Sequence, residues 1–220
     1  MGISRLVLTA GGVVLVGFGV ALLLRDPLLL PGEQLVLVGD SLSVGLAATA
    51  AYGGKGALQH ECDERGIHLL ALGKGSTTAA QWSGSGYLNR ERLIPALAQH
   101  PRAVMIVLGT NDCRYDFGIC QPVFAQNLLN MASEIHSAGA VPVLVGMPEM
   151  PWESSAAGKA RMAFARAAMY TAAKVNDGVY LEPPPVAVAR WSDGIHASAE
   201  GNRIWASYLM SVLDKTKRWR

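Results

Sequence analysis

The sequence has almost no net charge. It contains 19 Lys and Arg residues against 17 Asp and Glu residues, which gives +2 at pH 7. Four of the basic residues stand within the last six positions, so the rest of the chain is close to −2 (Lys215, Lys217, Arg218 and Arg220). A broad basic face of the kind that binds nucleic acid is therefore not expected.

Cysteine is scarce, with three residues in the whole chain. Cys113 and Cys120 are close enough in sequence to bridge a loop in an oxidising compartment, which would leave Cys62 unpaired. Two reduced thiols are the alternative. Cys113 and His196 do not stand at a zinc-binding spacing. We therefore expect no metal site.

Nucleotide-binding signatures and internal repeats are also missing. The stretch GKGST at 73–77 lacks the upstream glycine, and a Ser or Thr directly after its lysine, that a phosphate-binding loop requires. No repeat or low-complexity tract interrupts the chain. We expect one domain of 220 residues with a full core and no cofactor.

One long apolar run is present near the beginning. Residues 6–24 carry no charge, and as a helix rising about 1.5 Å per residue they would cover the roughly 30 Å of a bilayer core. We interpret residues 1–25 as an uncleaved membrane anchor, followed by a linker at 26–33 with two prolines. A secretory signal is the alternative, with weak cleavage sites near Gly19 to Ala21, and a buried helix of the domain is a third. The short basic N-terminus favours a single-pass protein with its domain outside the cytoplasm, in the periplasm if the source is bacterial, or secreted after cleavage.

The remainder alternates between strand-like and helix-like segments. Continuous apolar strands separated by helices predict a parallel sheet covered on both faces, an α/β fold with three α/β/α layers. This domain spans 34–214, and a basic tail follows at 215–220. The predicted strands are Gln34–Val38, Ile67–Leu72, Ala103–Leu108, Val141–Gly146 and Gly178–Leu181; the predicted helices are 43–52 with 56–65, 87–99, 121–138, 154–175 and 198–214.

Polar groups that could take part in catalysis follow several of these strands. Ser41 comes directly after the first strand, where it is either a helix cap or a nucleophile at the carboxyl edge of the sheet. Asp193 and His196 are three positions apart, close enough for the carboxylate to orient the imidazole toward such a serine. Asn111 and the backbone N–H of Gly75 follow two further strands and are donors suited to an oxyanion.

The order of these motifs resembles the GDSL, or SGNH, hydrolase family. GDSL stands at 39–42, the glycine motif at Gly75, GTND at 109–112 and DGIH at 193–196, and the similarity runs from about 34 to 212. It implies a flavodoxin-like five-stranded sheet, with Ser41 as nucleophile, His196 as base and Asp193 as its orienting acid. It also implies an oxyanion hole from the backbone N–H groups of Ser41 and Gly75 and the Asn111 side chain. This chain departs from the family at 73–74, where Gly and Lys stand in place of a common Asn.

The expected activity is serine ester hydrolysis through an acyl-enzyme. We favour a small acyl ester such as an O-acetyl group of envelope carbohydrate over a lipid ester, because the sequence holds no long apolar insertion that could form a lid. Alternatives are an O-acyltransferase using the same residues and a catalytically silent carbohydrate-binding module. The candidates for lining the substrate pocket are apolar or aromatic, and about half should simply be packing residues: Trp82, Tyr115, Phe117, Met147, Met150 and Trp191.

Overall fold

The computed structural model describes residues 26–47, 54–114, 122–149, 155–183, 193 and 195–217. Its centre is a sheet of five parallel strands in the order β2-β1-β3-β4-β5. The central strand is β3, and every one of its residues is apolar and buried. The five predicted strands and their parallel arrangement are confirmed. The strands are β1 (Gln34–Gly39), β2 (His68–Ala71), β3 (Ala103–Val107), β4 (Val141–Val145) and β5 (Val179–Leu181).

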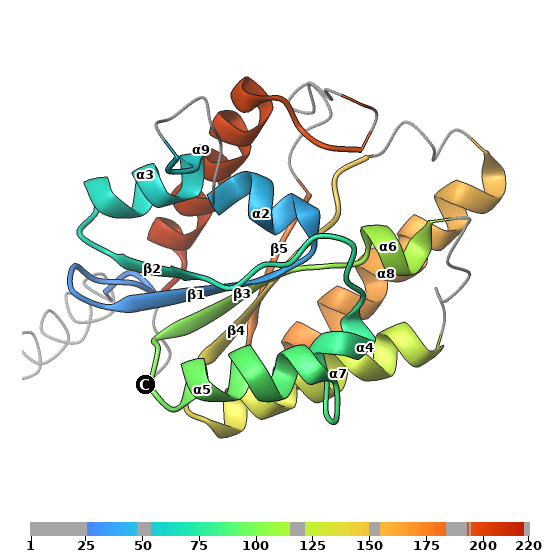
Figure 1. Cartoon of the computed structure of the whole chain (residues 1–220), viewed down its shortest axis with the longest axis horizontal. Coiled ribbons are helices and arrows are strands. Elements are labelled where there is room, and N and C mark those ends of the chain that lie inside the picture. The colour runs from blue at the N-terminus through green and yellow to red at the C-terminus, as the bar shows by residue number, and fades with distance from the viewer. Residues whose placement is uncertain are drawn as a thin grey trace, which may run out of the picture.

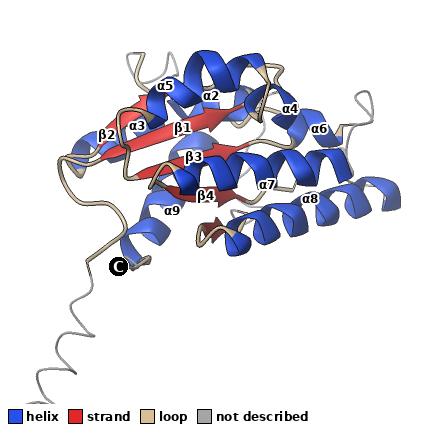
Figure 2. Ribbon diagram, turned by 90° about the horizontal axis from the view of Figure 1, so that it is seen from below, coloured by secondary structure: helices blue, strands red, loops and turns tan. Residues whose placement is uncertain are grey.

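Helices cover both faces of the sheet, as the alternating pattern predicted. One face carries α2 (Ser41–Ala47), α3 (Ala57–Glu64) and α9 (Ala199–Lys215), and Figure 1 shows them on one side of the strands. The other face carries α4, α5, α7 and α8, of which α7 and α8 lie in front of the strands in Figure 2. Their bounds are α4 (Ala79–Trp82), α5 (Ile94–Leu97), α7 (Pro122–Ser137) and α8 (Ala156–Val175).

Three helix predictions need correction. The first helix begins at Ser41 rather than 43, because the chain turns as soon as β1 ends. The predicted helix 87–99 is present from 87 to 97, but it contains a π-helical segment, η2 (Asn89–Leu93), before α5; Pro95 has no N–H to donate, which interrupts the regular ladder. The four-residue helices α4 and α6 (Thr110–Cys113) were not predicted, since they are too short to show a helical period.

The two ends of the described chain meet at one edge of the sheet. Pro27 and Lys217 form an isolated antiparallel bridge, and the N–H of Leu28 donates to the carbonyl of Thr216 at 2.8 Å. This is the amino edge, where β1 and β3 begin. The predicted membrane segment 6–24 lies outside the described residues. Within the described ranges, the structure has no helix of sufficient length and apolarity to span a bilayer.

Candidate active site

Ser41 stands at the carboxyl edge of the sheet because β1 stops abruptly at a glycine. A Cβ added to Gly39 would lie 2.0 Å from the carbonyl oxygen of Val107, so only glycine lets the ends of β1 and β3 approach this closely. The same carbonyl accepts the N–H of Asp40 at 3.2 Å. The chain then enters α2 with Ser41 as its first residue. The side chain is thereby placed at the sheet edge where open α/β folds bind ligands.

Two hydrogen bonds link Ser41 to residues from the other end of the chain. The Oγ atom of Ser41 lies 2.8 Å from Nε2 of His196, although 155 positions separate them. The Nδ1 atom of the same imidazole lies 2.7 Å from Oδ2 of Asp193. The structure therefore brings the predicted nucleophile, base and orienting acid into one continuous chain of hydrogen bonds.

The second oxygen of Asp193 organises the loop that carries the histidine. Oδ1 accepts the backbone N–H groups of Ile195 at 2.9 Å and His196 at 2.7 Å. The hydrogen bond to the His196 ring, together with these two N–H groups, holds the pKa of Asp193 well below its usual range. This carboxyl group is exposed, yet it remains ionised and in place to orient the imidazole.

Helix α9 anchors the same loop from its far side. Ser198 caps the helix, with its Oγ accepting the N–H of Gly201 at 3.1 Å. The buried Asn202, one turn into α9, donates from Nδ2 to the carbonyl of Ala197 at 3.2 Å. The residue after His196 is therefore tied to a helix that packs against α3 and α2.

The candidate oxyanion donors lie around Ser41. A Cβ added to Gly75 would be 3.9 Å from Cβ of Ser41, which places this glycine loop directly beside the serine. Within the described part of the chain, the backbone N–H groups of Ser41 and Gly75 donate to no protein acceptor. Asn111 has two amide hydrogens, and the carbonyl of Thr77 takes one at 2.9 Å. The arrangement can stabilise negative charge developing on a carbonyl oxygen.

The model of the GDSL-like Lipase/Acylhydrolase family matches residues 37–204, most of the described domain. The chain belongs to this family. It is an acylhydrolase of GDSL type, and the sequence resemblance to that family is confirmed.

Solved structures similar to this acylhydrolase include three esterases or hydrolases. An acetylxylan esterase from Geobacillus stearothermophilus is 19% identical, with a TM-score of 0.64 and coverage of 84% of this chain and 95% of that one. An α/β hydrolase from the metagenome of Lake Arreo, Spain, is 17% identical, with a TM-score of 0.66 and coverage of 86% of this chain and 98% of that one. The psychrotrophic esterase EstA from Pseudoalteromonas sp. is 19% identical, with a TM-score of 0.63 and coverage of 83% of this chain and 97% of that one. At these identities the likeness establishes the fold, including the α/β architecture expected from the sequence. No curated protein matches the chain.

The acylhydrolase contains a clamp on the Gly75 loop that the sequence did not reveal. Asn111 holds the carbonyl of Thr77, and the next residue, Asp112, accepts the N–H of Ala79 at 3.0 Å. Both side chains are presented by the short helix α6, whose first turn follows Gly109 in a left-handed conformation (φ 116°). The GTND motif therefore ties the glycine loop to the end of β3. The Asp directly after Asn111 was the available signal.

At 73–74, where this chain departs from the family motif, the glycine loop runs close to α2. A Cβ at Gly73 would lie 2.2 Å from Oγ of Ser43, so a larger residue at this position would require the Ser43 side chain to move. On its other side, Nη1 of Arg92 donates to the carbonyl of Leu72 at 2.8 Å. The backbone of Lys74 donates to the carbonyl of Gly39 at 2.9 Å, next to the serine turn.

Two buried carboxyl groups accompany the site. Burial raises the pKa of Asp40 to about 7, opposed by the N–H of Leu42, which it accepts at 2.9 Å, and reinforced by the charge of Asp112. Burial likewise raises the pKa of Asp112 to about 6, opposed by the N–H of Ala79. Sequence reasoning considered Asp40 only as a helix cap, which its bond from the N–H of Leu42 confirms, and it assigned Asp112 no role.

The sequence-based candidates for lining the pocket divide into two groups. Trp82 and Met147 are fully buried, and Nε1 of Trp82 donates to Oγ1 of Thr77, so these two are packing residues. The other four, and Cys120 with its predicted bridge to Cys113, lie outside the described residues (Tyr115, Phe117, Met150 and Trp191). Cys62 is a buried free thiol. In the described ranges, no three His, Cys, Asp or Glu side chains are grouped so as to hold a metal ion.

Proposed function

We propose that the protein is a serine ester hydrolase in which Ser41 is the nucleophile, His196 the general base and Asp193 its orienting acid. The observation that carries this proposal is the continuous hydrogen-bond chain from Asp193 through both ring nitrogens of His196 to Ser41. The ionised Asp193 holds Nδ1 protonated and leaves Nε2 as the acceptor for the serine proton. A helix cap would not need a histidine at hydrogen-bond distance from Oγ.

The reaction would proceed in two acyl transfers. His196 takes the Oγ proton as Ser41 attacks the ester carbonyl carbon, and the carbonyl oxygen becomes an oxyanion between the N–H groups of Ser41 and Gly75 and the Asn111 amide. Collapse of this intermediate expels the alcohol, which takes the proton from His196. Water then attacks the acyl-enzyme by the same route and releases the acid and free Ser41.

Two related structures support the roles of the acid and base. Catalytic mutants of the Geobacillus acetylxylan esterase replace a histidine, or an aspartate three positions before it, by alanine. Asp193 and His196 have the same order and spacing in this chain. Their side chains also make the contact that such a pair requires.

We propose a small acyl ester, with O-acetyl groups of carbohydrate as the favoured substrate. The acetylxylan esterases among the similar structures act on such groups, and this chain spans nearly the full length of the one described above. The absence from the sequence of a long apolar insertion agrees with a short acyl group, because long acyl chains require an extended apolar cover.

We further propose that residues 6–24 anchor the enzyme in a membrane, with the domain on the extracytoplasmic side. The support is the uncharged run of 19 residues in the sequence, from Leu6 to Leu24. Protease protection of the full chain in intact and permeabilised cells tests this placement. Cleavage of the domain only after the cytoplasmic membrane is permeabilised would contradict it, because a periplasmic domain is already accessible once an outer membrane has been opened.

A chain-length series of p-nitrophenyl esters, from acetate to palmitate, tests the activity with the full chain in a neutral detergent. Ser41→Ala is the nucleophile variant and Ser211→Ala, in α9 away from the site, is its matched control. We expect turnover that is highest on acetate, unchanged in Ser211→Ala and absent in Ser41→Ala. Acetate release from an acetylated oligosaccharide then tests whether the enzyme accepts O-acetyl groups of carbohydrate.

Other results of these assays have defined meanings. A clear preference for palmitate would replace the carbohydrate proposal with a lipid ester. Acetyl transfer to an added sugar in place of acetate release would identify the acyltransferase. No serine-dependent turnover on any ester or sugar would overturn the proposed mechanism.

A further inference from the structure

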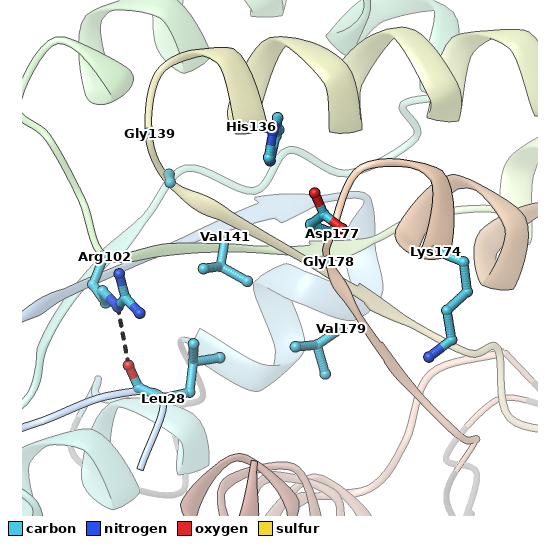
Figure 3. A pocket seen from close by; sticks show the side chains of 10 residues that line it. Leu28, Arg102, His136, Gly139, Val141, Lys174, Asp177, Gly178 and Val179 are labelled. Carbon is cyan, nitrogen blue, oxygen red and sulfur yellow. Dashed lines mark hydrogen bonds between the residues drawn. The ribbon is translucent and has the colours of Figure 1, made fainter. Parts of the chain in front are cut away.

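The two edges of the sheet differ in how their polar groups are arranged. At the amino edge, a cavity of about 600 Å³ has Arg102 and Lys174 on opposite sides of Val141 and Val179, as Figure 3 shows. An apolar floor therefore separates its two cations. At the carboxyl edge, polar groups from several segments meet at one buried side chain in the glycine loop, that of Thr77.

The hydroxyl group of Thr77 has three polar neighbours. Thr77 follows Gly75 by two residues, and only 1% of its surface is exposed. Its Oγ1 accepts the indole N–H of Trp82 at 3.1 Å and lies 2.8 Å from the carbonyl oxygen of Lys74 and 3.4 Å from that of Gly39. A hydroxyl has one hydrogen to donate. The shorter distance assigns it to the carbonyl of Lys74.

This hydrogen bond fixes the peptide group that contains the N–H of Gly75. The carbonyl of Lys74 and the N–H of Gly75 belong to one planar peptide, in which the two groups point in opposite directions. The bond from Thr77 holds the carbonyl toward the buried side of the loop, so the N–H points to the exposed side. There, a Cβ added to Gly75 would lie 3.9 Å from Cβ of Ser41. Thr77 therefore sets the direction of a proposed oxyanion donor.

The backbone of the loop explains how Thr77 reaches back to Lys74. Ser76, between Gly75 and Thr77, has a left-handed conformation with φ 58°. A positive φ at the third position of a four-residue turn brings the first and fourth residues together. The N–H of Lys74 also donates to the carbonyl of Gly39 at 2.9 Å, so the turn is held at its first residue as well.

The indole of Trp82 orients the Thr77 hydroxyl. Trp82 is fully buried in α4, and its N–H occupies one lone pair of Oγ1, which leaves the hydroxyl hydrogen for the carbonyl of Lys74. Successive hydrogen bonds polarise one another. The chain from Trp82 through Thr77 to the Lys74 carbonyl therefore also makes the N–H of Gly75 a stronger donor.

We propose that Thr77 is a positioning residue of the oxyanion hole, which holds the peptide between Lys74 and Gly75 so that its N–H faces the developing oxyanion. This role rests on the proposed function, in which Gly75 donates to that oxyanion. Thr77 acts through Gly75 and not on the reacting atoms. A hydroxyl that only satisfied its neighbours in the core would affect stability without a specific effect on turnover.

The kinetic test compares Thr77→Val, which has nearly the same shape without the hydroxyl, with Thr77→Ser, which keeps it. The full chain in a neutral detergent is assayed on p-nitrophenyl acetate, below the thermal midpoint of each variant. In Thr77→Val, kcat should fall by about 10- to 100-fold, part of the roughly 10²–10³-fold cost of losing one oxyanion donor. KM and the shape of the pH profile should stay unchanged, because Asp193 and His196 are untouched.

The two control variants should behave differently from Thr77→Val. Thr77→Ser should retain most of the turnover, because its hydroxyl can reach the same carbonyl. Thr171→Val, at an exposed threonine of α8, is the matched control for the exchange of Thr for Val and should change nothing.

A second measurement does not depend on activity. The ¹⁵N resonance of Gly75 reports on hydrogen bonding at the carbonyl of the same peptide and moves upfield when that bond is lost. We expect an upfield shift in Thr77→Val and almost none in Thr77→Ser. The indole N–H resonance of Trp82, assigned with Trp82→Phe, should also move upfield in Thr77→Val, because the indole loses its acceptor.

The outcomes separate this role from the proposed function. Wild-type kcat in Thr77→Val, with Ser41 still essential, would reject the role of Thr77 and leave the esterase mechanism in place. An equal fall of kcat in Thr77→Ser, or an unchanged Gly75 resonance in Thr77→Val, would reject it as well. Absence of serine-dependent turnover in the wild type would reject the proposed function, and the role of Thr77 with it.

Discussion

The charge of Asp112 acts on the buried carboxyl group of Asp40 and raises its pKa beyond the effect of burial alone. Each of the two residues stands next to a proposed oxyanion donor, Asp40 before Ser41 and Asp112 after Asn111. Each also accepts a backbone N–H in one of the two loops, from Leu42 and Ala79. The turns that carry the oxyanion donors are therefore built on a pair of buried acids.

The first prediction concerns the pH dependence of stability. Asp40 ionises near 3.8 in the unfolded chain and near 7 in the folded one. Between these values the folded state binds more protons, so the Asp40 contribution to stability is full below pH 3.8 and is lost as the pH rises to 7. Asp40→Asn keeps an oxygen for the N–H of Leu42 and does not titrate. Its free energy of unfolding in urea should rise relative to wild type from pH 4 to 7, on the order of a few kcal/mol. A constant difference across this range would contradict the buried-acid interpretation.

The second prediction concerns Asp193. Asp193→Asn retains an oxygen for the N–H groups of Ile195 and His196 but places an NH₂ group against Nδ1 of the ring, which favours the wrong tautomer. We expect kcat on p-nitrophenyl acetate to fall by about 10²–10⁴ with an unchanged thermal midpoint. Activity near that of wild type would show that the exposed carboxylate is dispensable.

The third prediction concerns the Asn111 side chain. Asn111→Ala removes a proposed oxyanion donor, and kcat should fall by about 10²–10³ with little change in KM. Because the bond to the carbonyl of Thr77 is lost as well, the thermal midpoint is measured in parallel. Full activity of this variant, with Ser41 still essential, would remove Asn111 from the oxyanion hole.

The fourth prediction compares two glycines on either side of the serine. Gly39→Ala places a Cβ against the carbonyl of Val107 and should destabilise the protein by about 3 kcal/mol. Gly45→Ala lies inside α2, where the nearest atom outside the helix is 3.4 Å away, and should stabilise by up to about 1 kcal/mol. Urea unfolding of both variants measures the contrast. Similar effects at the two positions would mean that the close approach of β1 and β3 tolerates a methyl group.

The strands of the sheet could be predicted from the sequence because they are buried on both faces. Continuous apolar runs such as 103–107 carry this information locally, and parallel order follows from the helices between them. The candidate site could also be predicted, because its residues follow the carboxyl ends of parallel strands, which all lie at one edge of the sheet. That reasoning placed Ser41, Asn111 and His196 at one edge, and the structure brings Ser41 and His196 within hydrogen-bond distance.

The features that sequence reasoning missed depend on contacts between distant residues. The hydrogen bond from the N–H of Ala79 to Asp112 joins positions 33 apart, and the Asp after Asn111 in the sequence does not by itself identify its partner. The four-residue helix α4 begins with that contact. Trp82 was a candidate for the substrate pocket because an aromatic residue after a glycine loop has the same sequence signature whether it lines a site or fills the core. Its burial is decided by the packing of α4 against α7 and η2.

The bridge between Pro27 and Lys217 holds both ends of the described chain at the edge of the sheet opposite Ser41. A strand of six residues such as β1 spans about 20 Å at about 3.3 Å per residue, and it separates the edge where the chain ends meet from the edge that holds Ser41. For a domain tethered through the residues before 26, the serine would face away from the bilayer at roughly that height. Under the proposed anchoring, Ser41 would therefore act on esters above the membrane surface rather than on lipid esters within it.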